Sequence, residues 1–362
     1  MTAGEREVEQ LLRGGLANVY PSASLSFGRG REPRTFFVGD AAADTWFDIA
    51  SLTKALSTTL LVMRLCDQGR LRLDEEVLPG AQLMHLLSHS AGFPACFPPL
   101  WAEQQGLLVA PSEQTRQKVF QTVLATPRQA AGERSLYSDL GFIALGDLVE
   151  QRGKSRLDDQ LAQLLAPLDL SLGFRALDRS VELPPQHCAP TRRESPQRQQ
   201  LRGLVHDDTA RAMLGVAGHA GLFAKSEAVY RLAQALLDCY HAVDSPSARA
   251  LGLRQATVRR FFAVPGLPGL PSTWGLGFDH PDPLRAGQVN SSSAGALWSR
   301  LGVGHLGFTG CSVWIDPVSR LCAVLLSNRV DVETTEAAEA TKASLRALRP
   351  MLHDAIVRCE VW

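Results

Sequence analysis

Residues 47–60 read FDIASLTKALSTTL, and they place Ser51 three positions before Lys54. Residues three apart lie on one face of a helix, so a helix that begins here would bring the hydroxyl and the amine together. A serine hydroxyl is a poor nucleophile until a neighbouring base takes its proton. Burial would lower the pKa of Lys54 and make it a usable base, and the helix N-terminus favours an oxyanion. The stretch therefore predicts a covalent catalytic site at the start of a helix.

The residues that follow Lys54 separate this pair from a chance match. An isolated serine–lysine pair most often marks a helix start with a solvated lysine. Here apolar residues repeat at helical spacing from Leu56 to Leu65. A solvated lysine is less expected at the head of such a helix, so the context favours a functional Lys54.

Composition and charge describe an ordinary globular chain of 362 residues, long for one core and short for three domains. Apolar residues make up 45% and charged residues 20%. Because Lys plus Arg and Asp plus Glu both number 37, the formal net charge is zero. Nothing here indicates a nucleic acid or an anionic membrane as a partner, so the expected partner is a small-molecule substrate. The oligomeric state stays open.

The seven cysteines are scattered and form no C-x-x-C motif, which favours reduced thiols. The first thirty residues are charged and lack a signal-peptide apolar core, and no apolar run reaches transmembrane length. These features predict a cytoplasmic protein. His85 and His89 have metal-ligand spacing on a predicted helix, but no carboxylate completes a set. We therefore expect no metal, and no motif indicates a cofactor.

The order of predicted elements is strands, helices and strands again. Helical periodicity covers residues 5–20, 51–69, 82–90, 113–126, 139–152, 158–166, 225–240 and 332–358. Strand patterns cover residues 23–27, 35–38, 274–278, 304–316 and 321–327.

This order predicts an α/β (α+β) fold. An antiparallel sheet would be built from both termini and flanked by helices, with a mainly helical subdomain inserted. Residues 1–50 and 238–362 would form the sheet domain and residues 51–237 the insertion. Because ligand clefts favour domain boundaries, we expect the active site between the two parts.

A second candidate motif is Tyr137-Ser138-Asp139, just before a predicted helix. Ser138 or Asp139 suits the N-cap position of that helix. A phenol whose pKa is lowered by a nearby ammonium can move protons, so Tyr137 is a candidate acid–base group. The simpler interpretation is a capped helix preceded by a buried aromatic ring.

A third candidate is the glycine-rich stretch from Gly304 to Gly310. Its glycines allow a ligand to approach strand backbone closely. An exposed N–H there could form an oxyanion hole with the N–H of Ser51. The alternative is a glycine-rich edge strand with a packed His305. The absence of a Gly-x-Ser-x-Gly elbow disfavours an α/β-hydrolase.

Together these three motifs give the chain its family resemblance. It resembles the serine beta-lactamase and penicillin-binding-protein superfamily, and within it the class C beta-lactamase-related serine hydrolases, which include many esterases. That pattern is Ser-x-x-Lys, Tyr-x-Asn and Lys-Thr-Gly in this order. The matching positions are Ser51 and Lys54, residues 137–139, and residues 305–307. Residues 86–94, 218–223 and 326–329 also look like this branch.

The resemblance implies a role for each matched residue. Ser51 would be the acylated nucleophile, and Lys54 would hold the proton network. Tyr137 would be the general base of acylation and would activate water for deacylation. The N–H groups of Ser51 and Phe308 would form the oxyanion hole.

Three positions depart from the family pattern, and they bear on the substrate. Asp139 replaces an asparagine that donates to a substrate acylamide, and an ionised carboxylate cannot donate. His305 and Leu306 replace the lysine and threonine that bind a substrate carboxylate. His305 keeps a possible cation, but Leu306 has no hydroxyl. The departures favour a carboxylesterase acting on small neutral esters.

Asp139, His305, Leu306 and Gly307 are therefore expected substrate-binding positions. His219, in the stretch from Gly218 to Phe223, either lines the same pocket or fills a turn. Other functions remain open with the same site: a beta-lactamase or D-Ala-type peptidase, or an acyltransferase. A non-catalytic ligand-binding module is a further alternative, although it would not need Lys54 and Tyr137 beside Ser51.

Overall fold

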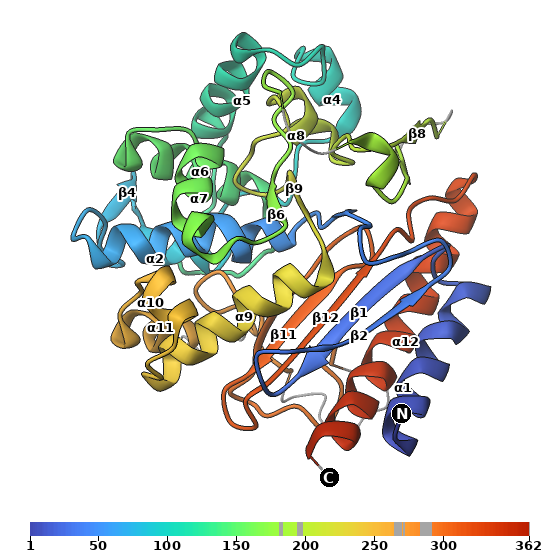
Figure 1. Cartoon of the computed structure of the whole chain (residues 1–362). Helices are drawn as coiled ribbons and strands as arrows, with labels where there is room; N and C mark the ends of the chain where they lie inside the picture. Colours follow the sequence, from blue (N-terminus) through green and yellow to red (C-terminus); the bar gives the residue numbers. More distant parts are fainter. Residues whose placement is uncertain (181–183, 194–197, 264–269, 271, 283–291, 362) are drawn as a thin grey trace.

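The central sheet combines strands from both ends of the chain (Figure 1). We describe a computed structural model that covers residues 1–180, 184–193, 198–263, 270, 272–282 and 292–361. The strands are antiparallel in the order β10-β11-β12-β1-β2. Their bounds are Ala23–Gly28 (β1), Arg34–Val38 (β2), Val303–Leu306 (β10), Ser312–Asp316 (β11) and Leu321–Ser327 (β12). The predicted mixed fold with an antiparallel sheet drawn from both termini is confirmed.

Helices cover both faces of this sheet. Helices α1 (Ala3–Gly14) and α12 (Thr335–Val361) lie on one face, and α9 (Ser226–His241) lies on the other (Figure 1). Successive strand residues point to opposite faces, so Leu25 and Phe27 of β1 pack in the core under α1 and α12. Ser24 and Ser26 point to α9, where both hydrogen-bond with Ser226 at 2.5 and 2.8 Å. Both faces of the strand are thus buried with their polar groups satisfied.

The other helices gather mainly beside the sheet (Figure 1). Their bounds are Leu60–Asp67 (α2), Leu83–Leu87 (α3), Pro99–Gln104 (α4), Glu113–Ala125 (α5), Asp139–Gly153 (α6), Leu157–Leu165 (α7), Asp208–Ala212 (α8), Pro246–Leu251 (α10) and Gln255–Phe262 (α11). The predicted helix after Ser51 begins with a π-helical turn, η2 (Lys54–Thr59), and every residue of that turn is buried. Such turns are frequent at functional sites.

A small three-stranded sheet contains the strand that precedes Ser51 in the chain. Strands β3 (Phe47–Asp48), β9 (Leu222–Ala224) and β6 (Leu172–Phe174) form a small sheet in the order β3-β9-β6. Ile49 extends this pairing, because its N–H donates to the carbonyl of Leu222 at 3.0 Å. Two further strand pairs are Glu76–Leu78 (β4) with Ala81–Gln82 (β5), and Thr191–Arg192 (β7) with Gln200–Leu201 (β8).

Two predicted strands are wrong, because residues 304–316 form the two antiparallel strands β10 and β11 joined by a turn, and residues 274–278 form no strand. Residues 274–278 form a turn, and Trp274 makes a single β-bridge to Asp279. Asp279 makes a second single bridge, to Gly304 of β10. Helix α9, which begins in the predicted insertion, packs on β1, β11 and β12. The predicted domain division stays a prediction. Within the described residues, no helix has both the length and the apolar composition needed to cross a bilayer.

Candidate active site

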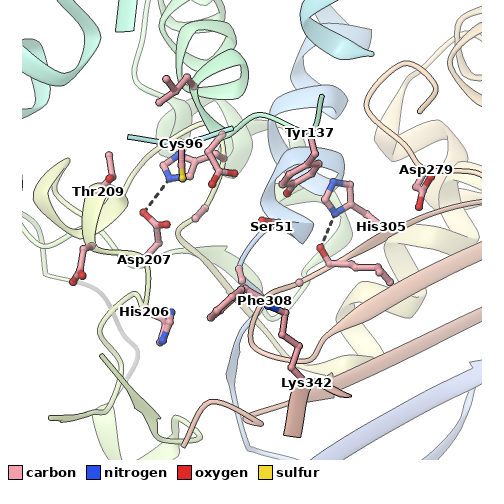
Figure 2. Close-up of a pocket in the computed structure, with 18 of the residues that line it drawn as sticks. Ser51, Cys96, Tyr137, His206, Asp207, Thr209, Asp279, His305, Phe308 and Lys342 are labelled. Atoms are coloured by element: carbon pink, nitrogen blue, oxygen red, sulfur yellow. Dashed lines mark hydrogen bonds and ion pairs between the residues drawn. The ribbon is translucent and has the colours of Figure 1, made fainter. Parts of the chain in front are cut away.

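Ser51 and Lys54 lie together at the floor of a cleft of about 1110 Å³. The Lys54 Nζ donates to the Ser51 Oγ at 2.9 Å and to the carbonyl oxygen of His219 at 3.1 Å. The Lys54 side chain is fully buried. Figure 2 shows Ser51 in the centre of the cleft, with Tyr137, His305 and Phe308 around it. The predicted proximity of the serine and the lysine is therefore present in the fold.

The backbone before Ser51 is held by the carboxylate of Asp48. Its Oδ1 accepts from the N–H of Ala50 at 2.8 Å, and its Oδ2 accepts from the N–H of His206 at 2.7 Å. Ala50 has a φ of 46°, a left-handed conformation that is uncommon for a residue with a Cβ. Burial raises the pKa of the Asp48 carboxyl to about 6, against the lowering effect of both hydrogen bonds. Asp48 thus fixes the turn that presents the nucleophile.

Lys54 forms an ion pair with Asp139, with 2.7 Å between Nζ and Oδ1. Burial alone would lower the pKa of the Lys54 ammonium. Attraction to Asp139 and Tyr137, with hydrogen bonds to both, outweighs burial and raises that pKa above its ordinary value. The expectation of a lysine turned into a base by burial is therefore wrong, because Asp139 neutralises the charge locally. Lys54 is an ammonium in this site.

Tyr137 completes the hydrogen-bonded group around Ser51. Burial raises the pKa of its phenol, and Asp139 adds to the rise. The cation of Lys54 and hydrogen bonds with Lys54 and Ser51 oppose it. The Lys54 Nζ also lies 4.9 Å from the centre of the Tyr137 ring. Because the net result is a raised pKa, the resting Tyr137 is a neutral phenol.

Aromatic rings hold Tyr137 in place. Its ring centre lies 4.6 Å from that of His89 and 5.1 Å from that of Trp274. The Nδ1 of His89 accepts from the N–H of Ser138 at 3.1 Å, which positions the segment that carries Tyr137. Burial, followed by the charge of the Lys54 ammonium, lowers the pKa of His89 well below its ordinary value. His89 is thus a neutral positioning residue. Ser138 also caps α6, as predicted for Ser138 or Asp139.

The predicted oxyanion hole consists of the backbone N–H groups of Ser51 and Phe308, two residues that line the cleft. Among the described residues, the N–H groups of Ser51 and Phe308 have no hydrogen-bond acceptor. Gly307 permits their approach, because a Cβ there would come within 2.7 Å of the Ile49 carbonyl oxygen. Thr309 fixes the other side by donating from Oγ1 to the Asp48 carbonyl at 2.7 Å. The arrangement suits an oxyanion hole, whose function stays a prediction.

The third motif carries no cation. Burial, together with the Lys54 charge, lowers the pKa of His305 to about 3. Its Nδ1 lies 2.9 Å from the carbonyl oxygen of Leu306, so the neutral ring donates to its neighbour. The cationic His305 considered from the sequence is therefore wrong, because burial excludes the charge. Leu306 is half-buried and adds no hydroxyl.

His219 lines the cleft beside Lys54. Its Nε2 lies 3.0 Å from the Oδ1 of Asp207, and its side chain is buried. Burial would raise the pKa of Asp207, but the charge and hydrogen bond of His219 prevail and lower it. Asp207 also caps α8 by accepting from the N–H of Ala210 at 2.7 Å. Of the two interpretations of His219, the structure favours the pocket wall, and substrate binding stays a prediction.

The sequence-predicted residues thus converge on one site. Eight of them line the cleft, and Lys54 lies beneath it, bonded to Ser51; the eight are Ser51, Tyr137, Asp139, His219, His305, Leu306, Gly307 and Phe308. Sequence reasoning missed Trp274 and Asp207, and it considered His89 as a possible metal ligand, without its contact with Tyr137. It also missed basic residues of α12 that line the cleft. Their helical spacing is visible in the sequence, but the sequence does not show that this face of the helix borders the cleft.

Comparison with known proteins gives one family and several relatives. The sequence profile of the family described as Beta-lactamase matches residues 8–347. An "N-acetylmuramyl-L-alanine amidase" of Bacillus subtilis (strain 168) is 29% identical over 318 residues, covering 79% of this chain and 68% of the relative. A "Putative D-alanyl-D-alanine carboxypeptidase" of Escherichia coli (strain K12) is 28% identical over 321 residues, covering 80% and 70%.

Solved structures share the fold at low sequence identity. One is described as "EstCE1, a hydrolase with promiscuous acyltransferase activity", with a TM-score of 0.70 and 18% identity, covering 96% of this chain and 98% of that one. Another is the unliganded simvastatin synthase LovD from Aspergillus terreus, with a TM-score of 0.66 and 19% identity, covering 98% and 100%. At such identities the likeness shows the fold alone.

Proposed function

The chain belongs to the beta-lactamase family of serine hydrolases, and from this we propose that it forms an acyl-enzyme at Ser51 and acts best on esters. The observation that supports this most directly is the closed group of Ser51, Lys54, Tyr137 and Asp139 at the floor of the cleft. In this group the nucleophile Ser51 hydrogen-bonds with Lys54 and with its proposed proton acceptor, Tyr137.

The proposed acylation starts from the fraction of the protein in which the Tyr137 phenol has released its proton to solvent. The Ser51 Oγ attacks the ester carbonyl carbon while its proton passes to this phenolate. The carbonyl oxygen becomes an oxyanion, which the N–H groups of Ser51 and Phe308 receive. When the tetrahedral intermediate collapses, the carbon–oxygen bond to the alcohol breaks and Tyr137 returns its proton to the leaving oxygen. The product is an acyl ester on Ser51.

Deacylation repeats these steps with water. Tyr137 takes a proton from a water molecule, whose oxygen attacks the acyl carbonyl. The bond to the Ser51 Oγ then breaks, and the serine recovers the proton from Tyr137. Lys54 remains an ammonium throughout, since Asp139 raises its pKa, and its charge stabilises the phenolate. Its hydrogen bond to the Ser51 Oγ orients the attacking atom.

The preference for esters follows from what the cleft does not offer near the scissile bond. A substrate carboxylate there would meet the neutral ring of His305 and the apolar side chain of Leu306. An acylamide carbonyl would meet the carboxylate of Asp139, which is committed to Lys54. A lost hydrogen bond to a charged group costs roughly 1.5–3 kcal/mol. An ester that is neutral around its scissile bond incurs neither loss.

A second candidate is hydrolysis of an amide or a D-alanyl peptide. It is supported by the names of the Bacillus subtilis and Escherichia coli relatives, which match about four fifths of this chain. Acyl transfer to an alcohol or amine would use the same acyl-enzyme. These activities differ from ester hydrolysis in the acyl donor or acceptor, so turnover assays separate them.

Covalent labelling tests the proposed function. A fluorophosphonate should label Ser51, and Ser51→Ala should abolish both labelling and ester turnover. Ser57→Ala is the matched control, because Ser57 lies in the same helix and its buried Oγ has no hydrogen-bond partner among the described residues. The control should keep both signals. Full turnover by the Ser51→Ala protein would end the proposal, and peptide turnover without ester turnover would replace it with the second candidate.

A further inference from the structure

The α12 wall of the cleft carries basic side chains that the proposed reaction does not use. Lys342, Arg346 and Arg349 are four and three residues apart, a spacing that places them on one face of the helix. All three line the same cleft as Ser51. Figure 2 shows Lys342 on the far side of Phe308 from Tyr137. We call these three residues the α12 basic stripe.

Arg349 is a buried cation with no counter-ion among the residues that the structure describes. Its side chain is 6% exposed, and its Nη2 donates to the carbonyl oxygens of Gly310 and Cys311 at 3.1 and 3.3 Å. Its Nε is buried with no hydrogen-bond partner, and no carboxylate of the described chain pairs with it. Burial lowers the pKa of its guanidinium to about 10. An unpaired buried charge is costly, so a bound anion would relieve it.

The rest of the stripe is only weakly neutralised. Lys342 has one ion pair, 3.6 Å from Glu339, and both side chains of that pair are at least one third exposed. Such surface pairs contribute little. Arg346 is exposed and has no ion pair within the described parts of the chain. The stripe therefore presents positive charge to the cleft.

We propose that the α12 basic stripe is a binding site for an anionic group, a carboxylate or a phosphate, at the end of the substrate remote from the scissile bond. This rests on the proposed ester hydrolysis at Ser51 and specifies its substrate class. Guanidinium groups bind both anions through paired hydrogen bonds. An anion adjacent to the scissile bond would instead face His305 and Leu306, which do not bind it.

The size of the cleft agrees with a substrate longer than a short ester. At about 1110 Å³ it slightly exceeds the usual range for small-molecule pockets, roughly 300–1,000 Å³. A short acyl group would occupy a part of this volume near Ser51. The stripe supplies recognition for a group that extends beyond it.

Matched esters test the proposal. We would compare 4-nitrophenyl butyrate with 4-nitrophenyl hydrogen adipate, and phenyl butyrate with the butyrate esters of 4-hydroxybenzoate and of 4-hydroxyphenyl phosphate. These place a carboxylate on the acyl side, and a carboxylate or a phosphate on the alcohol side. At least one anionic ester should exceed its neutral counterpart about tenfold in kcat/KM, with an advantage that shrinks as salt is added.

Charge reversal assigns that advantage to the stripe. Arg346→Glu should reduce the ratio of anionic to neutral kcat/KM by about tenfold or more. Arg358→Glu is the control, since it lies on the same helix, changes the net charge equally and is exposed beside Glu7. The control should keep the ratio. No anionic advantage in the unmodified protein, or an equal effect of both variants, would overturn the proposal.

A binding measurement keeps this test independent of catalysis. Adipate and phenyl phosphate would be titrated calorimetrically into the Ser51→Ala protein, which cannot form an acyl-enzyme. Binding of one of them should weaken about tenfold when Arg346→Glu is added. If esters are not hydrolysed but the anion binds, the proposed function fails and the stripe stands. If esters are hydrolysed and neither anion binds, the stripe fails alone.

Discussion

The two ends of the cleft treat charge in opposite ways. At the inner end the Lys54 ammonium meets the Asp139 carboxylate at 2.7 Å, and burial keeps His305 neutral. At the α12 end, Arg349 is buried without a carboxylate and Arg346 is exposed without one in the described residues. The charges at the inner end are thus paired before any substrate binds, whereas those at the α12 end, the outer end, are not. The difference assigns the proposed chemistry to the inner end and the proposed substrate recognition to the outer end.

This separation has a physical basis. Groups that move protons must have fixed positions and fixed charges, because small displacements alter the pKa values on which the rate depends. A group that selects a ligand gains most when the ligand supplies the missing partner. Changes at the inner end should therefore alter kcat, and changes at the outer end should alter the choice among substrates.

The largest expected effect comes from removing the inner proton-transfer groups. Lys54→Ala and Tyr137→Phe should each lower kcat by about 10²–10⁴, the usual loss for an acid–base group. Steady-state kinetics on 4-nitrophenyl butyrate would measure the loss, and circular dichroism with thermal melting would check the fold. Lys154→Ala and Tyr240→Phe make the same substitutions away from the cleft and should keep the rate. A variant that folds and keeps most of its kcat would show that its residue is misassigned.

A smaller effect is expected in substrate preference at the third motif. Hydrolysis of 4-nitrophenyl butyrate should exceed that of a chromogenic cephalosporin by at least about two orders of magnitude in kcat/KM. The reason is that each lost hydrogen bond to a carboxylate is worth about 10- to 150-fold. Leu306→Thr should narrow the gap by restoring a hydroxyl, and Leu301→Thr, at an exposed position, should not. Comparable efficiencies in the unmodified protein would favour a beta-lactamase instead.

The smallest effect tests the neutrality of the inner end directly. The Asp139 carboxylate raises the pKa of Tyr137, so Asp139→Asn should lower it. Because the reaction needs deprotonated Tyr137, kcat rises with pH through that pKa, and the rising limb should move to lower pH. The gain at pH 7 should be less than about tenfold, the change that one pH unit gives. Asp147→Asn, on the same helix, is the control. An unchanged or upward-shifted profile would contradict the role given to Asp139.

Much of the site could be predicted because its motifs are local. The spacing of Ser51 and Lys54 predicted their contact, and Ser138 was one of two candidates for the cap that it forms. The antiparallel sheet from both termini followed from strand patterns at the two ends of the chain. The Ser51–Lys54 contact, the Ser138 cap and each single strand depend on neighbouring residues, whose geometry is set by helix and strand periodicity.

The charges could not be predicted, because they depend on contacts between distant segments. The sequence shows Lys54 in an apolar helix but not its contact with Asp139, which lies 85 positions later. That contact raises the pKa of Lys54, which burial alone would lower. His305 was left as a possible cation because its burial could not be known. Residues 274–278 alternate like a strand, yet Trp274 serves the aromatic wall around Tyr137. The α12 basic stripe needed the position of the helix over the cleft.

The double hydrogen bond of Asp48 also has a mechanical consequence. Its carboxylate ties the turn before Ser51 to His206, and its carbonyl is held by Thr309. Two segments that are distant in the sequence, at His206 and Thr309, are thereby bonded to the residue that also holds the turn before Ser51. The floor of the cleft cannot hinge without breaking these bonds together. Any movement that admits substrate or releases product is therefore expected at the rim of the cleft, while the floor holds the acyl group in a fixed position.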